Sequence, residues 1–525
     1  MITAADNKTI VVVGAGPAGL TAAYTLLQQK GYHVVVVEEC PQVGGIAKTL
    51  NHNGNLMDIG GHRFFTKVDE VNDFWNKIMP IQGKPSSDDI ALGTAKEFAA
   101  GGPDPQESDR VMLVRNRVSR ILYSQHFFDY PVSLSISTLR SMGLLNTIKV
   151  GVGYLCAMLR HREEKSLEDF YINRFGKPLY NMFFENYTQK VWGVHPSNIG
   201  ADWGRQRVKG LSIVAIFKDI LSRTFVPRSK RHVETSLIDR FTYPKYGPGQ
   251  LWEYLADDIK SLGGEIRLNC CVQEINISDG NAVKSVVVRN EDGSLQTIDC
   301  DYLLSSMPLR DLFNGIKGIQ VPDNVLHAAQ GLPYRDFITV GVLVNRLKFV
   351  NKTKIKTYGN RIPDTWLYIQ EPHVKVGRLQ LFNNWSPYLV KDNENTMWIG
   401  MEYFCTEGDT MWNTPDDKFI TMAADELVKI GAIESVDDVL DSTVYKIKKA
   451  YPAYFGTYGQ LDEVRGFLDG ITNLYCIGRN GQHRYNNMDH SMLTAMRAAD
   501  AIIEGRDGRD MVWSVNTEQE YHESK

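Results

Sequence analysis

The chain has little cysteine, and none of it is arranged for a cross-link or a metal site. Seven cysteines in 525 residues are an odd number and include no C-x-x-C pair, which argues against a disulfide framework and against zinc. No histidine or carboxylate cluster has ligand spacing either, so no metal is expected. Reduced thiols are typical of a cytoplasmic protein, and we expect that location.

Long basic runs and long apolar runs are also absent. Lys and Arg number 58 against 62 Asp and Glu, a net charge of −4, which favours neither nucleic acid nor an acidic membrane as a partner. The N-terminus lacks the features of a signal peptide. The most apolar later stretch, 144–159, is interrupted by Asn146, Lys149 and glycines and is shorter than the roughly 20 residues of a spanning helix. We therefore expect no transmembrane segment, and a buried or surface-associated helix at 144–159.

The composition is that of a globular protein, with 43% hydrophobic, 10% aromatic and 23% charged residues. At roughly 150 residues per domain, the length predicts two to four domains. Segment 83–110 is rich in Gly, Pro, Ser, Asp and Glu, a composition that buries little surface. This segment is predicted to be a solvent-exposed insertion.

A glycine loop lies near the start of the chain, between a predicted strand at 9–13 and a predicted helix at 20–29. The loop has the pattern Gly14-x-Gly16-x-x-Gly19. Backbone amides and the helix N-terminus can meet a pyrophosphate there, and the missing side chains permit its close approach. The pattern predicts the phosphate-binding turn of a βαβ unit.

An acidic residue closes the next strand of this unit, predicted at 33–37. Glu38 follows Gly14 by 38 − 14 = 24 residues, near the spacing of about 20 at which such an acid binds a ribose hydroxyl. Glu39 is the weaker candidate. Strand, loop, helix, strand and acid together predict a bound dinucleotide.

Paired glycines follow at Gly44-Gly45 and at Gly60-Gly61-His62. Such pairs suit the close passage of backbone beside an isoalloxazine ring. With these pairs the chain resembles the glutathione-reductase-type FAD fold of amine oxidases and protoporphyrinogen oxidases. The resemblance implies FAD as the cofactor.

The rest of the chain alternates helical and strand-like stretches. Helical spacing dominates 135–223, alternating apolar residues predict strands within 265–305 and 337–404, and a last strand at 473–478 precedes a helix at 489–504. The predicted fold class is α/β (α+β), a Rossmann-type FAD-binding domain with an inserted helical domain and an antiparallel-sheet substrate domain. The predicted boundaries are 1–110, 235–330 and 440–525 for a discontinuous FAD-binding domain, 111–234 for the mostly helical substrate domain and 331–439 for the antiparallel-sheet substrate domain.

Several longer strings are hard to obtain by chance. They read Tyr187-Thr-Gln-Lys-Val-Trp192-Gly, Trp366-Leu-Tyr368, Arg378-Leu-Gln-Leu-Phe-Asn-Asn-Trp-Ser386-Pro-Tyr388, Tyr451-Pro452 and Gly478-Arg479-x4-Arg484-Tyr485-Asn-Asn-Met-Asp489-His. Together with Gly60-Gly-His62 they resemble UDP-galactopyranose mutases, and the resemblance extends from residue 9 to about 504. Arg207 lies 207 − 192 = 15 residues after Trp192, where that family carries an arginine that binds the substrate's pyrophosphate.

The resemblance implies roles for individual residues. The catalytic residues would be His62, Arg207 and Arg378. The residues that bind the cofactor would be Gly14, Gly16, Gly19, Glu38, Gly44, Gly45, Gly60, Gly61, His62, Gly478, Arg479 and Asp489. The residues that bind the substrate would be Trp192, Arg207, Tyr368, Arg378, Tyr451 and Tyr485.

The implied reaction is the interconversion of pyranose and furanose forms of a nucleotide-diphosphate sugar, in cell-surface polysaccharide biosynthesis. Reduced FAD would act as a nucleophile at the anomeric carbon, with no net redox change. Guanidinium groups bind phosphates in bidentate fashion, and tyrosines donate to phosphate oxygens or stack on a base, so both residue types suit this substrate. NAD(P)H as external reductant and a homo-oligomer both stay open.

Two alternatives stay open. The string beginning Leu332-Pro-Tyr-Arg335 resembles protoporphyrinogen-oxidase-like and desaturase-like relatives as much as mutases. An FAD-dependent oxidase, dehydrogenase or desaturase would predict an apolar pocket and no role for the arginines. A non-catalytic flavoprotein would need no substrate pocket at all.

Overall fold

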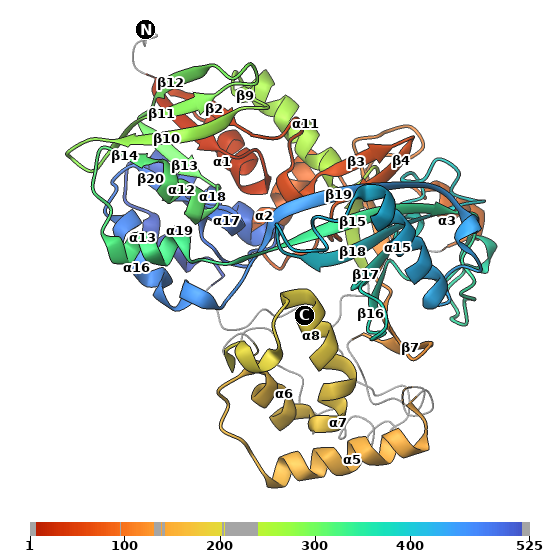
Figure 1. Cartoon of the computed structure of the whole chain (residues 1–525). Helices are drawn as coiled ribbons and strands as arrows, with labels where there is room; N and C mark the ends of the chain where they lie inside the picture. The colour runs from red at the N-terminus through yellow and green to blue at the C-terminus, as the bar shows by residue number, and fades with distance from the viewer. Residues whose placement is uncertain are drawn as a thin grey trace.

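The computed structural model describes residues 7–94, 96–130, 138, 142–201, 204 and 240–516. Its first part is a five-stranded sheet with the order β20-β13-β1-β2-β9, and all its pairs are parallel (Figure 1). The strands are β1 (Lys8–Val13), β2 (Tyr32–Val37), β9 (Glu265–Arg267), β13 (Tyr302–Ser305) and β20 (Leu474–Cys476).

Strand β1 is apolar throughout its second half because both faces of this sheet are covered. Ile10 and Val12 pack on one side in a core shared with helices α1 (Pro17–Leu27), α11 (Pro248–Ser261) and α18 (Met488–Glu504). Val11 and Val13 point the other way into a second core. The predicted strand, loop, helix and strand at the start of the chain are confirmed.

The second core joins the parallel sheet to a four-stranded sheet, β12-β11-β10-β14. Its strands are β10 (Cys271–Ile277), β11 (Val283–Arg289), β12 (Leu295–Asp299) and β14 (Ile316–Lys317). The helices packed around it are α12 (Leu309–Gly315), α13 (Asp323–Gln330) and α16 (Leu461–Asp469).

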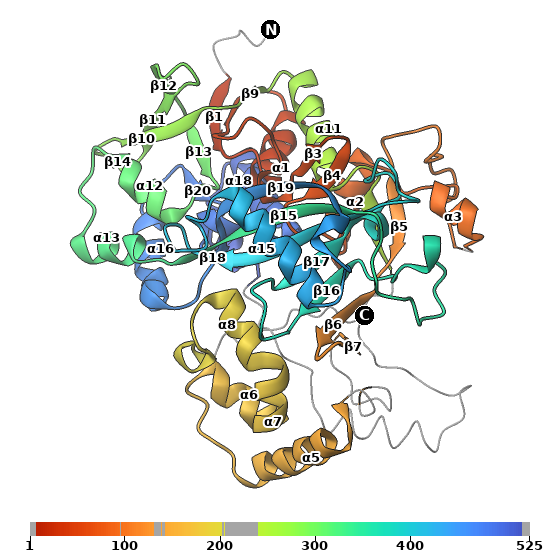
Figure 2. The same cartoon turned by 45° about the vertical axis from the view of Figure 1, so that its right-hand side comes forward.

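A seven-stranded sheet forms the next part, with the order β19-β15-β18-β17-β16-β6-β7 (Figure 2). Its pairs are antiparallel except for the parallel pair of β16 with β6. The strands are β6 (Ser119–Tyr123), β7 (His126–Asp129), β15 (Tyr334–Val344), β16 (Trp366–Ile369), β17 (Arg378–Leu381), β18 (Met397–Cys405) and β19 (Val439–Pro452).

The two faces of this sheet have different neighbours. Ile338, Val340 and Val342 of β15 pack in a core with helix α15 (Asp416–Lys429). Phe337 on the same strand points the other way, into a core shared with the helical unit. Strands β6, β7 and β19 belong to this sheet although the predicted boundaries give them to the helical and FAD-binding domains, so the sheet is larger than the sequence suggested. The pairing partners of an edge strand lie far away in sequence, and local pattern does not reveal them.

The helical unit lies on one side of both large sheets in both views (Figures 1 and 2). It consists of α5 (Leu144–Leu159), α6 (Leu167–Phe175), α7 (Lys177–Tyr180), the π-helical turn η2 (Asn181–Glu185) and α8 (Asn186–Trp192). The helical pattern predicted at 213–221 lies outside the described residues. Among the described helices, none has the length and apolarity to cross a membrane.

The insertion at 83–110 is not the freely solvated segment that its composition predicted. Lys96 Nζ contacts Asp89 Oδ1 at 2.5 Å, with both side chains nearly inaccessible to solvent. Arg115 Nη2 contacts Asp88 Oδ2 at 2.8 Å. The prediction was wrong in this part because composition counts polar groups without showing that they pair with one another. Asp88 and Asp89 belong to α3 (Ser87–Leu92).

The remaining elements are short or peripheral. They are β3 (Thr49–His52), β4 (Asn55–Asp58), β5 (Met112–Asn116), β8 (Arg240–Pro244), α2 (Asp69–Ile78), α14 (Phe382–Trp385), α17 (Gly478–Gly481), α19 (Arg509–Ser514), η1 (Gly45–Ala47), η3 (Pro196–Asn198), η5 (Tyr358–Asn360), η6 (Val436–Asp438) and η7 (Gly456–Gln460).

Candidate active site

A cavity of about 1750 Å³ is bordered by the parallel sheet, the seven-stranded sheet and the helical unit. Pockets for one small ligand measure about 300–1,000 Å³, so this volume accommodates a dinucleotide and a second ligand together. Among the described residues, no cluster of His, Cys, Asp or Glu could hold a metal ion.

The cavity gathers most of the predicted site residues from distant parts of the chain. From the predicted cofactor set it is lined by Gly14, Gly16, Glu38, Gly45, Gly60, Gly61, His62, Gly478, Arg479 and Asp489. From the predicted substrate set it is lined by Trp192, Tyr368, Arg378, Tyr451 and Tyr485. Gly19 and Gly44 are not among the residues that line the cavity, and Arg207 lies outside the described residues.

Two of the three glycines of the loop, Gly14 and Gly19, occupy positions where a side chain does not fit. A Cβ on Gly19 would lie 1.8 Å from the carbonyl oxygen of Gly14. Gly14 has a φ of +96°, and a Cβ there would lie 2.2 Å from Ser306 Oγ. Gly19 thus serves the packing of α1 onto β1, whereas Gly14 also borders the cavity.

The N-terminal end of α1 fits a pyrophosphate. Its N-cap residue, Gly16, provides no side-chain cap to the first amides of the helix. A Cβ on Gly45 would lie 3.1 Å from Gly16 Cα, and a Cβ on Gly478 would lie 2.9 Å from Ala18 Cβ. Two segments therefore approach the helix end through glycines that lack side chains, which leaves amide groups and the helix dipole for an anion.

Glu38 lies beside this loop, buried at 7% exposure. Its Oε2 accepts a hydrogen bond from the Ala15 amide at 2.7 Å, and its Oε1 accepts one from the Cys40 amide at 3.0 Å. A carboxylate offers about four acceptor positions, so two remain for ribose hydroxyls. The predicted acid is in place, and it also holds the glycine loop to the end of β2.

His62 enters the cavity from the loop after β4. Its Nδ1 lies 2.6 Å from the carbonyl oxygen of Gly60, and because a carbonyl only accepts, Nδ1 carries the proton. Burial, with the nearby positive charge of Arg479, lowers the pKa of His62 to about 4. The imidazole is therefore neutral near pH 7, and its Nε2 is an acceptor.

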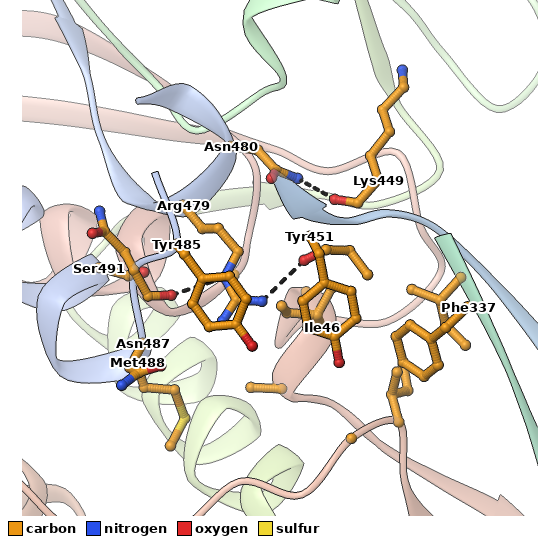
Figure 3. A pocket seen from close by; sticks show the side chains of 18 of the residues that line it. Ile46, Phe337, Lys449, Tyr451, Arg479, Asn480, Tyr485, Asn487, Met488 and Ser491 are labelled. Atoms are coloured by element: carbon orange, nitrogen blue, oxygen red, sulfur yellow. Dashed lines mark hydrogen bonds between the residues drawn. The ribbon is translucent and has the colours of Figure 1, made fainter. Parts of the chain in front are cut away.

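Arg479 is fixed by backbone carbonyls and aromatic rings. It donates Nε to the Asn486 carbonyl at 2.8 Å and Nη1 to the Ala450 carbonyl at 2.9 Å. Its guanidinium lies 4.7 Å from the centre of the Tyr485 ring. Tyr451 lies between Tyr485 and Phe337 and stacks on Tyr485 with ring centres 5.7 Å apart (Figure 3).

Arg378 lies in the part of the cavity away from the glycine loop, at the centre of a cluster of polar side chains. It donates Nε to Tyr187 Oη at 2.8 Å, and its Nη1 contacts Glu402 Oε2 at 3.2 Å and Tyr451 Oη at 3.5 Å. The guanidinium lies between the rings of Trp366, at 5.2 Å, and Phe404, at 4.8 Å. None of the described residues accepts a hydrogen bond from Nη2 in this arrangement, which leaves that edge for a ligand.

The protonation of this cluster follows from its burial. Burial opposes the charge on Arg378, but the neighbouring Tyr187, Tyr451 and Glu402 hold its pKa well above the usual value. Burial raises the pKa of Glu402, and Arg378 opposes that shift. We take the pair as charged, because the guanidinium neutralises the carboxylate directly.

Tyr368 and Trp192 occupy different environments. Tyr368 stacks on Tyr130, with ring centres 4.3 Å apart, and lies 5.9 Å from the ring of Trp366. Trp192 is 5% exposed and belongs to the core of the helical unit, so it borders the cavity from a packed position. Tyr368 is the more accessible of the two predicted substrate contacts.

Three residues near Arg378 were not predicted as site residues. Tyr187 and Lys190 occur in the string that contains Trp192, and their spacing of three residues, which places them on one face of a helix, was a usable signal. Lys190 Nζ donates to the carbonyl of Glu371 at 2.8 Å and to those of Ile369 and Val376 at 3.3 Å. Glu402 is a lone acid in the apolar strand β18, and a buried acid requires a partner.

A second wall of the cavity is apolar and aromatic. It comes from α6, α7 and η2 of the helical unit, and it consists of Tyr171, Phe175, Leu179, Phe183 and Phe184. The rings of Phe175 and Phe184 stack with centres 4.8 Å apart. The cavity thus has a polar part around Arg378 and an apolar part beside the helices.

Comparison with known sequences gives one family across most of the chain. The model of the flavin-containing amine oxidoreductase family matches residues 17–503. A probable UDP-galactopyranose mutase of Klebsiella pneumoniae is 28% identical over 211 residues, 37% of this chain and 44% of that protein. Protoporphyrinogen oxidase 2 of Arabidopsis thaliana is 23% identical over 198 residues, 38% of this chain and 35% of that protein. The chain matches less than half the length of these two curated relatives.

Other relatives match over greater lengths. A 15-cis-phytoene desaturase of Glycine max is 22% identical over 518 residues, 94% of this chain and 79% of that protein. A crystal structure of reduced UDP-galactopyranose mutase superposes with a TM-score of 0.75 at 20% identity, covering 98% of this chain and 97% of that one. A putative protoporphyrinogen oxidase from Exiguobacterium sp. 255-15 superposes with a TM-score of 0.62 at 16% identity, covering 95% and 98%. At these identities the likeness establishes the fold, and the predicted fold class is confirmed.

Proposed function

The chain belongs to the flavin-containing amine oxidoreductase family, and we propose that within this family it is a nucleotide-sugar mutase that interconverts pyranose and furanose forms. The observation that carries the proposal is the cluster around Arg378, where three tyrosines and an arginine that is only 13% exposed border the cavity. Arginine and tyrosine donors in a partly dry site suit a diphosphate.

The cofactor proposed for this site is FAD, which when bound and reduced would supply a nucleophile for the anomeric carbon. The amides at the start of α1 would hold its pyrophosphate, and Glu38 would accept from its ribose. His62, with Nδ1 tied to Gly60, would offer Nε2 as an acceptor to the ring system. Gly14, Gly16, Gly44, Gly45, Gly60, Gly61, Gly478, Arg479 and Asp489 stay proposed as further cofactor-binding residues.

At the substrate end, Arg378 would bind the diphosphate through its remaining Nη2 edge and stabilise the charge that develops as the diphosphate leaves. Tyr187 and Glu402 hold the guanidinium in the orientation that presents this edge. Tyr368, Tyr451, Tyr485 and Trp192 would shape the site around the sugar and the base. Arg207 stays proposed as a second diphosphate ligand, on the resemblance alone.

Further parts of the proposal rest on the same resemblance. The product would enter cell-surface polysaccharide biosynthesis, and the enzyme would work in the cytoplasm. NAD(P)H is proposed as the external reductant of the flavin, and a homo-oligomer as the assembled form.

The test is to reduce the purified protein with dithionite without oxygen and to add a panel of UDP- and dTDP-pyranoses. Furanose product formed while the flavin stays reduced would support a mutase. Arg378→Lys keeps a positive charge but removes the planar fork, and is expected to lower kcat about 10²–10³-fold. The matched control is Arg361→Lys, another mostly buried arginine, which does not line the cavity.

A second candidate is a net oxidoreductase acting on a largely apolar substrate. Two observations favour it: the aromatic wall from α6, α7 and η2, and the neutralisation of Arg378 by Glu402. In the same experiment, this candidate predicts that no sugar nucleotide binds. Nucleotide sugars that leave the flavin spectrum unchanged and yield no furanose would therefore favour it over the mutase.

A further inference from the structure

Helix α5 exposes an unusual amount of apolar side chain. Seven large apolar residues on it have exposed fractions between 54% and 86%. They are Leu144, Leu145, Ile148, Val152, Leu155, Met158 and Leu159. A contiguous apolar surface of this kind marks an interaction site rather than ordinary surface.

The exposed residues form one stripe along the helix. Leu144, Ile148, Val152, Leu155 and Leu159 follow one another at spacings of four, four, three and four, so at 100° per residue they share one face. The stripe runs the full length of α5.

The helix packs onto its own unit by the opposite face. Val150 and Ala157 are buried in the core of that unit. A Cβ on Gly153 would lie 2.3 Å from Pro178 Cδ, so a glycine allows α5 to approach α7 closely. The helix is therefore held by small and buried residues on its inner face, while its larger apolar residues face outward.

The stripe is flanked by basic residues. Helix α5 contains no acidic residue, and Lys149 on it and Arg160 at its end are exposed. Beyond the end of the helix, Arg162 lies 3.9 Å from Asp169 and is followed by the exposed acid Glu163. At 100° per residue, Lys149 and Arg160 lie together at one edge of the stripe. The whole chain has a net charge of −4. The positive charge beside the stripe is therefore local, and the overall composition does not reveal it.

Apolar residues with basic residues at their edge fit the headgroup region of an anionic bilayer. The 16 residues of α5 measure about 24 Å at 1.5 Å per residue, less than the roughly 30 Å of a hydrocarbon core. The helix can therefore lie in the plane of the interface but cannot cross it. In both views it lies on the side of the helical unit away from the two large sheets (Figures 1 and 2).

A second copy of the chain fits this stripe less well. Two copies meeting through α5 would bring the basic residues of both helices to one contact, with no acid on either helix to pair with them. Like charges at such a contact oppose association, whereas anionic headgroups neutralise them.

We propose that α5 is a membrane-docking helix that binds the surface of bilayers containing anionic lipid. The surface lies on the helical unit that also borders the cavity, so docking would bring the cavity near lipid. The proposal stands apart from the reaction, because it uses no residue of the candidate active site.

The test uses the full-length protein with its flavin, floated with vesicles of phosphatidylcholine alone or of phosphatidylcholine with phosphatidylglycerol. The stripe variant combines Ile148→Ser, Val152→Ser, Leu155→Ser and Leu159→Ser. The matched control combines Leu295→Ser and Leu440→Ser, which are exposed at 66% and 51% on β12 and β19. A charge variant combines Lys149→Glu and Arg160→Glu.

We expect the unmodified protein to float with the anionic vesicles and the stripe variant to lose roughly tenfold or more of its partitioning. The control variant keeps its binding, and the charge variant loses the preference for phosphatidylglycerol. Added salt weakens binding of the unmodified protein. If the stripe variant fails to fold, as shown by its melting curve and flavin content, the charge variant decides alone.

Three results would overturn the proposal. The unmodified protein floats with neither vesicle, or the folded stripe and charge variants bind as well as it does. Alternatively, sedimentation shows a dimer that the stripe variant loses, without vesicle binding, and the stripe is then a contact between copies.

Discussion

The two ends of the cavity are built by different means. At the end near α1, two segments approach the start of the helix through glycines that lack side chains. At the other end, Arg378, Glu402, Tyr187 and Tyr451 meet through side chains from four separate elements. The structure of the first end depends on the absence of side chains at its glycines, and that of the second depends on charge balance and hydrogen bonds. The two ends should therefore respond differently to substitution.

The largest expected effect is a steric one at the first end. Gly19→Ala places a methyl group on the carbonyl oxygen of Gly14, and neither backbone can move without opening the loop. We expect flavin binding to be lost, with a destabilisation of about 3 kcal/mol or more. Flavin content after purification and thermal unfolding measure these effects.

The matched control is Gly151→Ala, another helical glycine, whose Cβ would meet nothing within 4 Å. Because alanine is a better helix former, this change should leave flavin content intact and raise stability by up to about 1 kcal/mol. Equal flavin content in the two variants would show that the tight loop does not govern cofactor binding.

At the end around Arg378, a substitution should lower the free energy of unfolding by removing a charge. A bound anionic ligand should restore part of this stability. Glu402→Gln keeps the shape but leaves Arg378 without its carboxylate, which costs about 3 kcal/mol in the free protein. A bound diphosphate replaces the missing negative charge, so UDP should raise the melting temperature of this variant more than that of the unmodified protein. Thermal unfolding with and without UDP measures the difference.

Asp364→Asn is the control for this prediction. Asp364 is also buried and pairs with an arginine, Arg120, but neither residue lines the cavity. Its loss should destabilise the protein without any special response to UDP. If UDP stabilises both variants alike, Glu402 and Arg378 do not form a diphosphate site.

A smaller effect concerns the lysine that holds the turn beside Arg378. Burial lowers the pKa of Lys190 from its usual 10.5 to about 8. Between these values the unfolded chain holds a proton that the folded chain has released, so this lysine makes stability rise with pH from about 8 to 10.5. Lys190→Met should remove that rise by about 1–2 kcal/mol.

The measurement is chemical unfolding at several pH values, with Lys317→Met on an exposed site as the control. The same Lys190→Met variant should raise KM, because Lys190 binds carbonyls at the end of β16 and in the segment that leads from it to β17, and these strands carry Tyr368 and Arg378. An unchanged pH profile in the variant would contradict this account.

The smallest effect is expected at His62, between the two ends. Its pKa of about 4 lies below the usual 6.5, so between these values the unfolded chain binds the extra proton, and stability falls as pH drops from about 6.5 to 4. His62→Gln should flatten this fall by about 1 kcal/mol, whereas His126→Gln at an exposed position should not. Activity should show no titration of His62 between about pH 5 and 8; such a titration would mean that the imidazole is protonated in the working site.

The sequence was most informative where the backbone itself does the binding. The spacing of Gly14, Gly16 and Gly19 and the position of Glu38 predicted the loop, the helix and the acid as the structure has them. The sequence was less informative about insertion 83–110, where the buried Asp89 and the mostly buried Asp88 form ion pairs. It also gave no sign that Glu402 faces Arg378, because these residues meet only through the pairing of β17 with β18.

The sequence by itself therefore determined the local elements and the phosphate-binding loop, since helix and strand periods and glycine geometry are properties of neighbouring residues. Only the tertiary structure decided the charge state of Arg378, the carbonyl groups to which Lys190 donates, and which apolar side chains of α5 stay exposed. These depend on which distant side chains share a low-dielectric space or are left facing water, and that is fixed when the sheets and helices pack together.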